Sequence, residues 1–377
     1  MDSVNAHTSS KSSADQPPLV SICIPTYNGA RFLSQCLDSA LAQTWRDFEL
    51  VIVDDRSTDT TLEVAAAYAA RDPRVRLRQN DRNLGLVGNW TRCLHLSRGQ
   101  WIKFLFQDDL LAPSCLSKML AIRRPDVPLI VCRRALEIEP DTPQDLTQWY
   151  QSHAAQHMLR SLFPNVSFVS PSDFAARVVA QPMVNCVGEP TATLIHRSAF
   201  DRFGPFNPNF KVLVDWEFFA RIGVLHGLCY VDDELATFRV HSKSTTQTEL
   251  ARSSFRIYEL DPLIMLHELA YSAAFGSVRK LAMRRQDAID FRFPLADHVR
   301  QARRKAKRIP GKPGREALDD LADLIRTYPR MAQTPRGYVF VTVSKALRHA
   351  RWSLLRRAED LVLKGRRAIR SVDGRHP

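Results

Sequence analysis

The chain has 377 residues, of which 45% are hydrophobic and 25% are charged, an ordinary composition for a soluble globular protein of one large domain plus a smaller part, or of two domains. No stretch approaches the roughly 20 apolar residues that a membrane-spanning helix needs. The net charge is +13, and the basic excess lies in the last third, which indicates an anionic partner such as a membrane, a nucleic acid or a charged substrate.

Residues 1–18 are polar and lack the apolar core of a secretory signal. We therefore expect a disordered N-terminal tail on a cytoplasmic protein that can still lie on a membrane surface. The seven cysteines form no Cys-x-x-Cys pair, and several lie within apolar runs. They are predicted to be reduced core residues, in preference to zinc ligands or disulfides.

Short apolar runs alternate with amphipathic segments at the start of the chain. Buried strands are predicted at 19–24, 48–53, 75–77 and 101–106, with helices at 32–41, 62–70 and 87–96. The short links predict an α/β fold with a doubly wound, mostly parallel sheet. Such sheets bind ligands at the carboxyl ends of their strands, where this sequence has the polar loops 25–29, 54–59 and 107–109.

Regular patterning is lost over residues 133–170, which we interpret as an insertion or a variable region. It returns with a strand at 191–195, a helix at 215–225 and two strands at 228–231 and 235–240, after which the chain is helical and basic. These patterns predict an α/β domain over residues 19–245 and a helical basic region over residues 246–377.

Asp108 and Asp109 follow a predicted strand, and two adjacent carboxylates repel each other. A divalent cation that bridges the two phosphates of a nucleotide would offset this repulsion, since hard oxygen ligands suit Mg²⁺ or Mn²⁺. The alternative is the N-cap of a helix over Leu110–Leu120.

Asp54 and Asp55 follow the predicted strand at 48–53, where their carboxylates can accept hydrogen bonds from a ribose or a base. The alternative is a turn capped by Ser57 and Thr58. An NAD enzyme would need Gly-x-Gly-x-x-Gly after the first strand, and loop 25–29 lacks it.

Asp215 begins a helix beside Trp216, Phe218 and Phe219. Desolvation there would raise its pKa and make it a better general base, but, considered alone, Asp215 is more simply interpreted as a helix N-cap.

These acids fall in four ordered blocks, SICIPTYNGARFLSQCLDSALAQTWRDFELVIVDDRSTDTT, NLGLVGNWTRCLHLSRGQWIKFLFQDDLL, DWEFFARI and TFRVH, which together resemble family 2 glycosyltransferases. The resemblance covers roughly residues 19–244. It implies a glycosyltransferase-A fold over residues 19–245, a nucleotide diphosphate sugar donor, a divalent cation (Mg²⁺ or Mn²⁺) and inversion at the sugar. At the level of the family, it implies a glycan or lipid-linked acceptor, as in the synthesis of cell-envelope polysaccharide, lipopolysaccharide or glycolipid.

The resemblance also implies roles for individual residues of this chain. The residues expected to bind the nucleotide sugar are Pro25, Thr26, Tyr27, Asn28, Asp54, Asp55, Asn83, Gly85, Asp108 and Glu189. Among them, Thr26 and Tyr27 border the base, Asp55 binds it and Asp108 lies near the ribose. Glu189 is placed near the donor sugar, with a turn before a strand as an equal alternative.

Asp109 and His241 are the metal ligands that the resemblance implies, and Asp215 is the implied general base. Two residues depart from the family pattern. Gln107 stands where the family has a carboxylate, and Val214 stands where an acid often precedes the base. The departures leave room for a second hypothesis, a catalytically silent module that binds a nucleotide sugar or glycan. A nucleotidyltransferase is disfavoured because no Gly-rich, Lys- or Arg-bearing triphosphate loop follows the first strand.

Apolar residues recur at helical spacing between Val343 and Leu361, and Lys and Arg residues surround or follow them. Such a basic amphipathic helix can lie on an anionic membrane, or it can pack on the catalytic domain. Both interpretations stay open. Nucleic acid is not an expected partner, because no nucleic-acid-binding motif is present.

Overall fold

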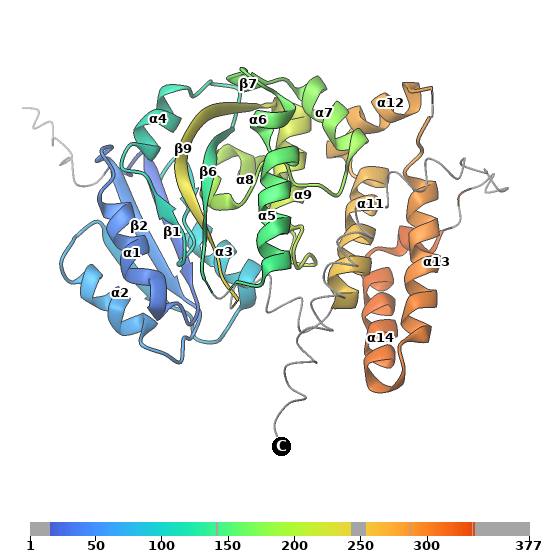
Figure 1. Ribbon diagram of the computed structural model, residues 1–377, viewed down its shortest axis with the longest axis horizontal. Coiled ribbons are helices and arrows are strands. Elements are labelled where there is room, and N and C mark those ends of the chain that lie inside the picture. Colours follow the sequence, from blue (N-terminus) through green and yellow to red (C-terminus); the bar gives the residue numbers. More distant parts are fainter. Residues whose placement is uncertain (1–15, 141, 243–253, 287, 334, 336–377) are drawn as a thin grey trace, which may run out of the picture.

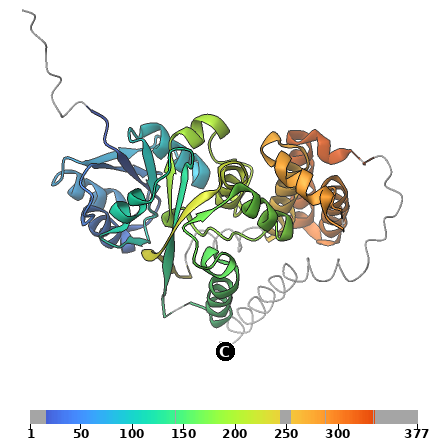
Figure 2. The same cartoon turned by 90° about the horizontal axis from the view of Figure 1, so that it is seen from above.

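The computed structural model (Figure 1) describes residues 16–140, 142–242, 254–286, 288–333 and 335. An α/β part, coloured blue to yellow, lies beside a group of helices coloured orange, and the view from above shows the same arrangement (Figure 2). Most of the predicted tail 1–18 and the whole of the amphipathic segment Val343–Leu361 lie outside the described residues.

A nine-stranded sheet is the centre of the α/β part, in the order β3-β2-β1-β4-β8-β6-β9-β5, with β7 paired to β9. Its strands are β1 (Val20–Thr26), β2 (Phe48–Asp54), β3 (Val75–Gln79), β4 (Trp101–Phe104), β5 (Leu110–Leu111), β6 (Leu129–Ile138), β7 (Phe168–Val169), β8 (Thr193–His196) and β9 (Leu228–Val240). Strands β1 to β4 pair in parallel, whereas β8 is antiparallel to both of its neighbours. The predicted α/β fold with a doubly wound, mostly parallel sheet is confirmed.

Helices cover both faces of the sheet. Those of the α/β part are α1 (Ala30–Leu41), α2 (Thr61–Ala69), α3 (Gly85–Leu96), α4 (Cys115–Ala121), α5 (Gln144–His157), α6 (Leu159–Leu162), α7 (Pro171–Ala180), α8 (Ser198–Phe203) and α9 (Val214–His226). Alternate residues of β1 enter different layers of the core. Ile22 packs in the cluster that contains α1 and α4, and Cys23 packs in the cluster that contains α3 and α9. All seven cysteines are buried and free, as predicted.

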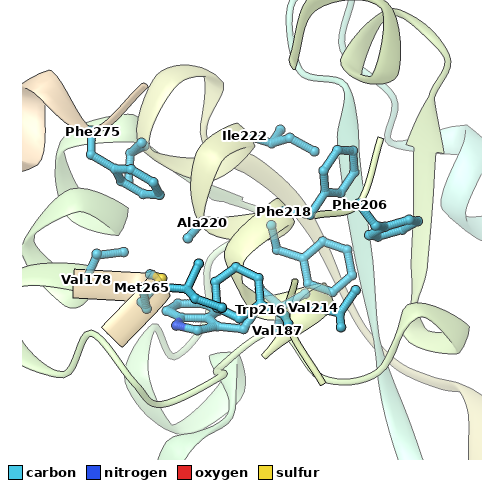
Figure 3. Packing of buried hydrophobic residues seen from close by; sticks show 14 of the residues in the cluster. Val178, Val187, Phe206, Val214, Trp216, Phe218, Ala220, Ile222, Met265 and Phe275 are labelled. Carbon is cyan, nitrogen blue, oxygen red and sulfur yellow. The ribbon is translucent and has the colours of Figure 1, made fainter. Parts of the chain in front are cut away.

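The C-terminal helices are α11 (Asp261–Tyr271), α12 (Gly276–Arg284), α13 (Arg292–Arg308) and α14 (Gly311–Thr327), preceded by a π-turn, η3 (Arg256–Leu260). The expected helical region after residue 245 is thus present in its described part. Its core is continuous with that of the α/β part, since Trp216 of α9 and Met265 of α11 belong to one buried cluster (Figure 3). Among the described residues, no helix is both long and apolar enough to cross a membrane.

Three expectations from the sequence are wrong. Residues 133–170 are not patternless, since they hold the end of β6 together with α5, α6 and β7. The two strands expected at 228–231 and 235–240 form one strand, β9, whose pairing with β6 shifts register around Arg133. The alternative helix over Leu110–Leu120 does not form, because β5 follows Asp109 and α4 begins only at Cys115.

Candidate active site

The loops that follow β1 and β2 are joined by hydrogen bonds at the carboxyl edge of the sheet. Asn28 donates its backbone N–H to Ser57 Oγ at 2.9 Å and accepts at Oδ1 from the Thr58 N–H at 2.8 Å. Gly29 donates its N–H to Thr61 Oγ1 at 2.8 Å. Asn28 has a φ of 49°, a left-handed conformation that asparagine tolerates better than most residues. Asn28 therefore fixes the shape of the loop in which Thr26 and Tyr27 lie.

Asp54 and Asp55 are both buried at the end of β2. Asp54 accepts hydrogen bonds from the hydroxyl and the backbone N–H of Ser57, at 2.5 and 3.1 Å. Asp55 accepts from the N–H groups of Leu84 and Gly85, at 2.8 and 2.9 Å. The Asp55 carboxylate thus satisfies orphan donors at the start of α3. Both acids shape the loops around the site.

Asn83 and Gly85 lie at the start of α3, against the loop after β2. Asn83 Nδ2 donates to the backbone carbonyl of Asp55 at 3.1 Å, and the φ of Gly85 is 73°, in the left-handed region that favours glycine. Both residues are therefore held beside the Asp55 loop, where the sequence predicts the donor.

Gln107 joins the loop after β4 to the loop after β1. Its amide accepts from the Tyr27 N–H at 2.9 Å and donates to the Tyr27 carbonyl at 3.1 Å. A Cβ on Gly29 would lie 2.1 Å from Gln107 Oε1, so only glycine fits there without a shift. The Tyr27 side chain is 47% exposed and is available to contact a ligand. Gln107, which stands where the family has a carboxylate, therefore connects these two loops by hydrogen bonds.

Asp108 faces His241 from the end of β9. Asp108 Oδ2 and His241 Nε2 are 3.0 Å apart, and the side chains are 20% and 8% exposed. The imidazole ring lies 5.0 Å from the ring of Phe32, between centroids. Nδ1 of His241 is buried and has no hydrogen-bond partner among the described residues. The pair thus presents one carboxylate and one imidazole at a partly open edge of the site.

Asp109 has the opposite environment, although it is the next residue. It is fully buried, and its two oxygens accept from Thr191 Oγ1 at 2.5 Å and from the Arg239 N–H at 3.0 Å. Burial, and then the charge of Asp108, raise the pKa of Asp109 well above its ordinary value. Asp109 therefore fastens β9 and the segment before β8 to the loop that carries Asp108.

Asp215 lies in the first turn of α9, whose N-cap residue is Leu213. Burial, and then the charge of Glu189, raise the pKa of Asp215 to about 8. Asp215 Oδ1 accepts from the Trp216 N–H at 2.6 Å. Asp215 is not the N-cap residue, and its raised pKa is a property of acid–base residues at active sites.

Glu189 acts on two of these acids, since its charge contributes to the raised pKa of both Asp109 and Asp215. The Glu189 carboxylate is paired with the guanidinium of Arg134, whose side chain is only 4% exposed. Tyr150 of α5 is also buried here, and burial followed by the charge of Glu189 raises its pKa. The segment that looked like an insertion therefore contributes α5 to this cluster.

The comparisons with known proteins agree with one another. The profile described as Glycosyl transferase family 2 matches residues 21–184. An uncharacterized protein of Mycobacterium tuberculosis (strain CDC 1551 / Oshkosh) is 32% identical over 234 residues, which are 62% of this chain and 70% of that protein. A PGL/p-HBAD biosynthesis glycosyltransferase of Mycobacterium bovis (strain BCG / Pasteur 1173P2) is 30% identical over 259 residues, which are 69% of this chain and 87% of that protein. The chain belongs to the family 2 glycosyltransferases.

This glycosyltransferase also shares its fold with a solved structure, that of residues 1–349 of S. aureus TarS in complex with UDP-GlcNAc. The TM-score is 0.50 and the sequence identity 14%, over 82% of this chain and 91% of the TarS chain. The likeness agrees with the glycosyltransferase-A type of sheet.

The glycosyltransferase brings the predicted residues together in two groups. Pro25, Thr26, Tyr27, Asn28, Asp54, Asp55, Asn83 and Gly85 lie in the loops at the ends of β1 and β2 and at the start of α3. The second group consists of Asp108, Asp109, Glu189, Asp215 and His241. Sequence reasoning missed Arg134, Tyr150 and Thr191, because nothing local to these residues indicates that they contact the acids.

The donor set of Asp108 and His241 fits a divalent cation. The two atoms are hydrogen-bonded at 3.0 Å in this structure, and a carboxylate oxygen and an imidazole nitrogen are donor types that would bind a divalent cation. Oxygen ligands from a diphosphate and from water would complete the shell, as is usual for Mg²⁺. Asp109 fits less well, since both of its oxygens already accept hydrogen bonds in a fully buried position.

A cavity of about 570 Å³ opens elsewhere, between α8, α9 and α11, beside Glu217 and Glu268. None of the predicted site residues lines it. Glu217 lies two residues after Asp215, which puts the two side chains on opposite sides of α9.

Proposed function

We propose that this glycosyltransferase moves a sugar from a nucleotide diphosphate donor to a hydroxyl of a glycan or lipid-linked acceptor, with metal assistance and inversion at the anomeric carbon. The observation that carries the proposal is the acid cluster. The pKa of Asp215 is raised to about 8, in part by the charge of Glu189. The same charge raises the pKa of Asp109, which follows Asp108 of the Asp108–His241 pair.

The donor's nucleotide would lie on the loops after β1 and β2. The half-exposed ring of Tyr27 would border the base, and the loop shaped by Asp54 and Asp55 would surround it. Binding of UDP-GlcNAc by TarS, which has the same fold, supports a donor of the nucleotide diphosphate sugar class.

Asp108 and His241 would hold the cation, with Asp109 as the buried support behind them. This differs from the prediction that Asp109 is itself a ligand, because only Asp108 is partly open and faces the imidazole. A divalent cation at these residues would neutralise charge on the departing diphosphate. A mixed carboxylate and imidazole set favours Mn²⁺ over Mg²⁺.

Asp215 would accept the proton of the acceptor hydroxyl while the acceptor oxygen forms its bond to the anomeric carbon. The bond from that carbon to the diphosphate oxygen breaks in the same step, on the opposite face of the sugar, so the configuration inverts. The diphosphate leaves as an anion and needs no proton from a second carboxylate, which distinguishes this reaction from glycoside hydrolysis.

The first test is the release of free nucleoside diphosphate from a panel of nucleotide sugars with Mn²⁺, Mg²⁺ or EDTA. The panel is run with the wild type, Asp215→Asn, Asp108→Asn and the control Asp233→Asn, a carboxylate that is paired with Lys118 at the surface. We expect metal-dependent release from one donor that falls to a low residual rate in Asp215→Asn and Asp108→Asn and is kept in the control Asp233→Asn. Donor binding without release, even with acceptor extracts added, would favour the silent binding module and contradict the proposal.

We also propose that the basic C-terminal region binds an anionic membrane surface, where a lipid-linked acceptor would lie. In the described part, α13 exposes a stripe of cations at helical spacing, Arg300, Arg303, Arg304, Lys307 and Arg308. Such stripes are attracted to acidic lipids. Co-sedimentation with anionic vesicles should retain the full chain, and a chain cut before Gly337 should bind less. Equal binding by the two would contradict a role for the last 41 residues.

A further inference from the structure

The start of α9, the helix that carries Asp215, is held by a carboxylate from the C-terminal helices. Asp261, the first residue of α11, is fully buried. It accepts hydrogen bonds from three consecutive backbone N–H groups, those of Lys211 at 3.0 Å, Val212 at 2.7 Å and Leu213 at 3.0 Å. One side chain therefore binds the whole segment from which α9 begins.

This contact replaces a local helix cap. Leu213, the N-cap residue of α9, makes no capping hydrogen bond with its own side chain, and N–H groups at a helix start need acceptors. Three successive N–H groups that point to one place form an anion-binding concavity, and a negative charge there is favoured by the helix dipole. Asp261 fills the concavity from 46 residues beyond Asp215 in the chain.

Asp261 itself is placed by rigid surroundings. The π-turn η3 ends at Leu260, directly before it, and Pro262 follows it. Met265, one turn further along α11, lies in the buried cluster that also contains Trp216 (Figure 3). The carboxylate is thus fixed relative to α9 by packing on one side and by three backbone N–H groups on the other.

We propose that Asp261 is a positioning residue for sugar transfer, which acts through the backbone of residues 211–213 to hold Asp215 in place and makes the C-terminal helices part of the catalytic machinery. The inference rests on the proposed function, since it assumes that Asp215 is the general base. The donor-binding loops after β1, β2 and β4 make no described hydrogen bond to Asp261 or to residues 211–213.

The expected effect is a loss of kcat without a loss of donor affinity. In Asp261→Asn the side-chain shape is kept, but one acceptor oxygen becomes an NH₂ group that faces backbone donors. A shift of about 1 Å in a catalytic group can cost about 10²-fold in rate. We therefore expect kcat to fall by about 10- to 100-fold, while the donor KM stays within about twofold.

The experiment is a double-mutant cycle on the full chain, with Asp261→Asn, Asp215→Asn and the double variant. Asp290→Asn is the matched control, because its carboxylate also accepts a backbone N–H, that of Arg292, in the same helical region. Nucleoside diphosphate release is divided by the number of donor-binding sites from titration, so that a partly unfolded sample does not mimic a loss of kcat. We expect Asp261→Asn to lower kcat in the wild-type background and to leave the low residual rate of Asp215→Asn unchanged.

Each other result has a distinct meaning. A normal kcat in Asp261→Asn, a rise in donor KM alone, or an equal further loss in the Asp215→Asn background would overturn the positioning role and leave the proposed function intact. Full activity of Asp215→Asn would refute the general base itself, and the positioning proposal with it.

Discussion

The rate of transfer should rise with pH through the neutral range, because Asp215 must be ionised before it can accept a proton. Burial and the neighbouring charge of Glu189 raise the pKa of Asp215 to about 8, and only the deprotonated form is a general base. An aspartate of ordinary pKa, about 3.9, is ionised throughout this range. An enzyme whose general base had that ordinary pKa would therefore show a constant rate from about pH 6 to pH 9.

The size of the effect follows from the titration. With a pKa of about 8, about one-tenth of the Asp215 side chains are ionised at pH 7 and about one-hundredth at pH 6. The value of kcat/KM for the donor should thus rise about tenfold between these pH values. A cation bound nearby favours the ionised carboxylate and moves the midpoint to lower pH. The decisive feature is the tenfold rise per pH unit below that midpoint.

The assay is nucleoside diphosphate release across this pH range at several Mn²⁺ concentrations. Loss of the metal in acid would also lower the rate, but more Mn²⁺ would then move the midpoint to lower pH. A midpoint that belongs to Asp215 stays fixed at saturating metal. It should move to lower pH in Glu189→Gln, because the variant removes a like charge. A flat profile, or a midpoint that only Mn²⁺ moves, would refute Asp215 as a desolvated general base.

Four further substitutions distinguish the proposed metal ligands, their buried support and the residue that joins two loops. Asp108→Ala and His241→Ala should each lower metal-dependent turnover by about 10²–10³-fold and weaken Mn²⁺ binding in an EPR titration, and unchanged binding would contradict the assignment. Asp109→Ala should lower Tm in thermal unfolding, because a buried hydroxyl and a backbone N–H lose their acceptor, at a cost of about 1–3 kcal/mol each. An unchanged Tm together with a loss of Mn²⁺ binding would instead make Asp109 a metal ligand. Gln107→Ala removes two hydrogen bonds to the Tyr27 backbone, each worth about 0.5–1.5 kcal/mol, so the donor KM should rise about tenfold. A loss confined to kcat would contradict the role of Gln107 in joining the two loops.

The parallel half of the sheet could be predicted because its strands are short apolar runs with short links to amphipathic helices. The half around β6 and β9 could not be predicted, because its polar residues are paired with residues that lie far away in the sequence. Arg134 interrupts the apolar pattern of β6, but it is buried against Glu189 and over the ring of Phe238. In β9 the polar residues 232–234 divide the pattern, and the shift in pairing with β6 at this point lets one strand continue through them.

The acids of the site could be found in the sequence, whereas the division of roles between Asp108 and Asp109 could not. Parallel strands share an edge, so polar residues after β1, β2 and β4 had to lie close together. Whether an acid faces the ligand or the core depends on distant partners. Thr191 and the Arg239 N–H bind Asp109, while His241 faces Asp108. These partners lie 82 to 133 residues further along the chain, beyond any local pattern.

Val214 stands directly before the proposed base Asp215, at a position where the family often has an acid. Its side chain is buried in the hydrophobic core. It also leaves no second acid next to the base in the sequence of this helix. Glu217 is the next carboxylate on the helix, but it lies on the opposite side of α9 and is paired with Arg221 at 2.7 Å. No carboxylate on this turn can therefore replace Asp215, and a general-base role predicts that Asp215→Asn loses transfer almost completely.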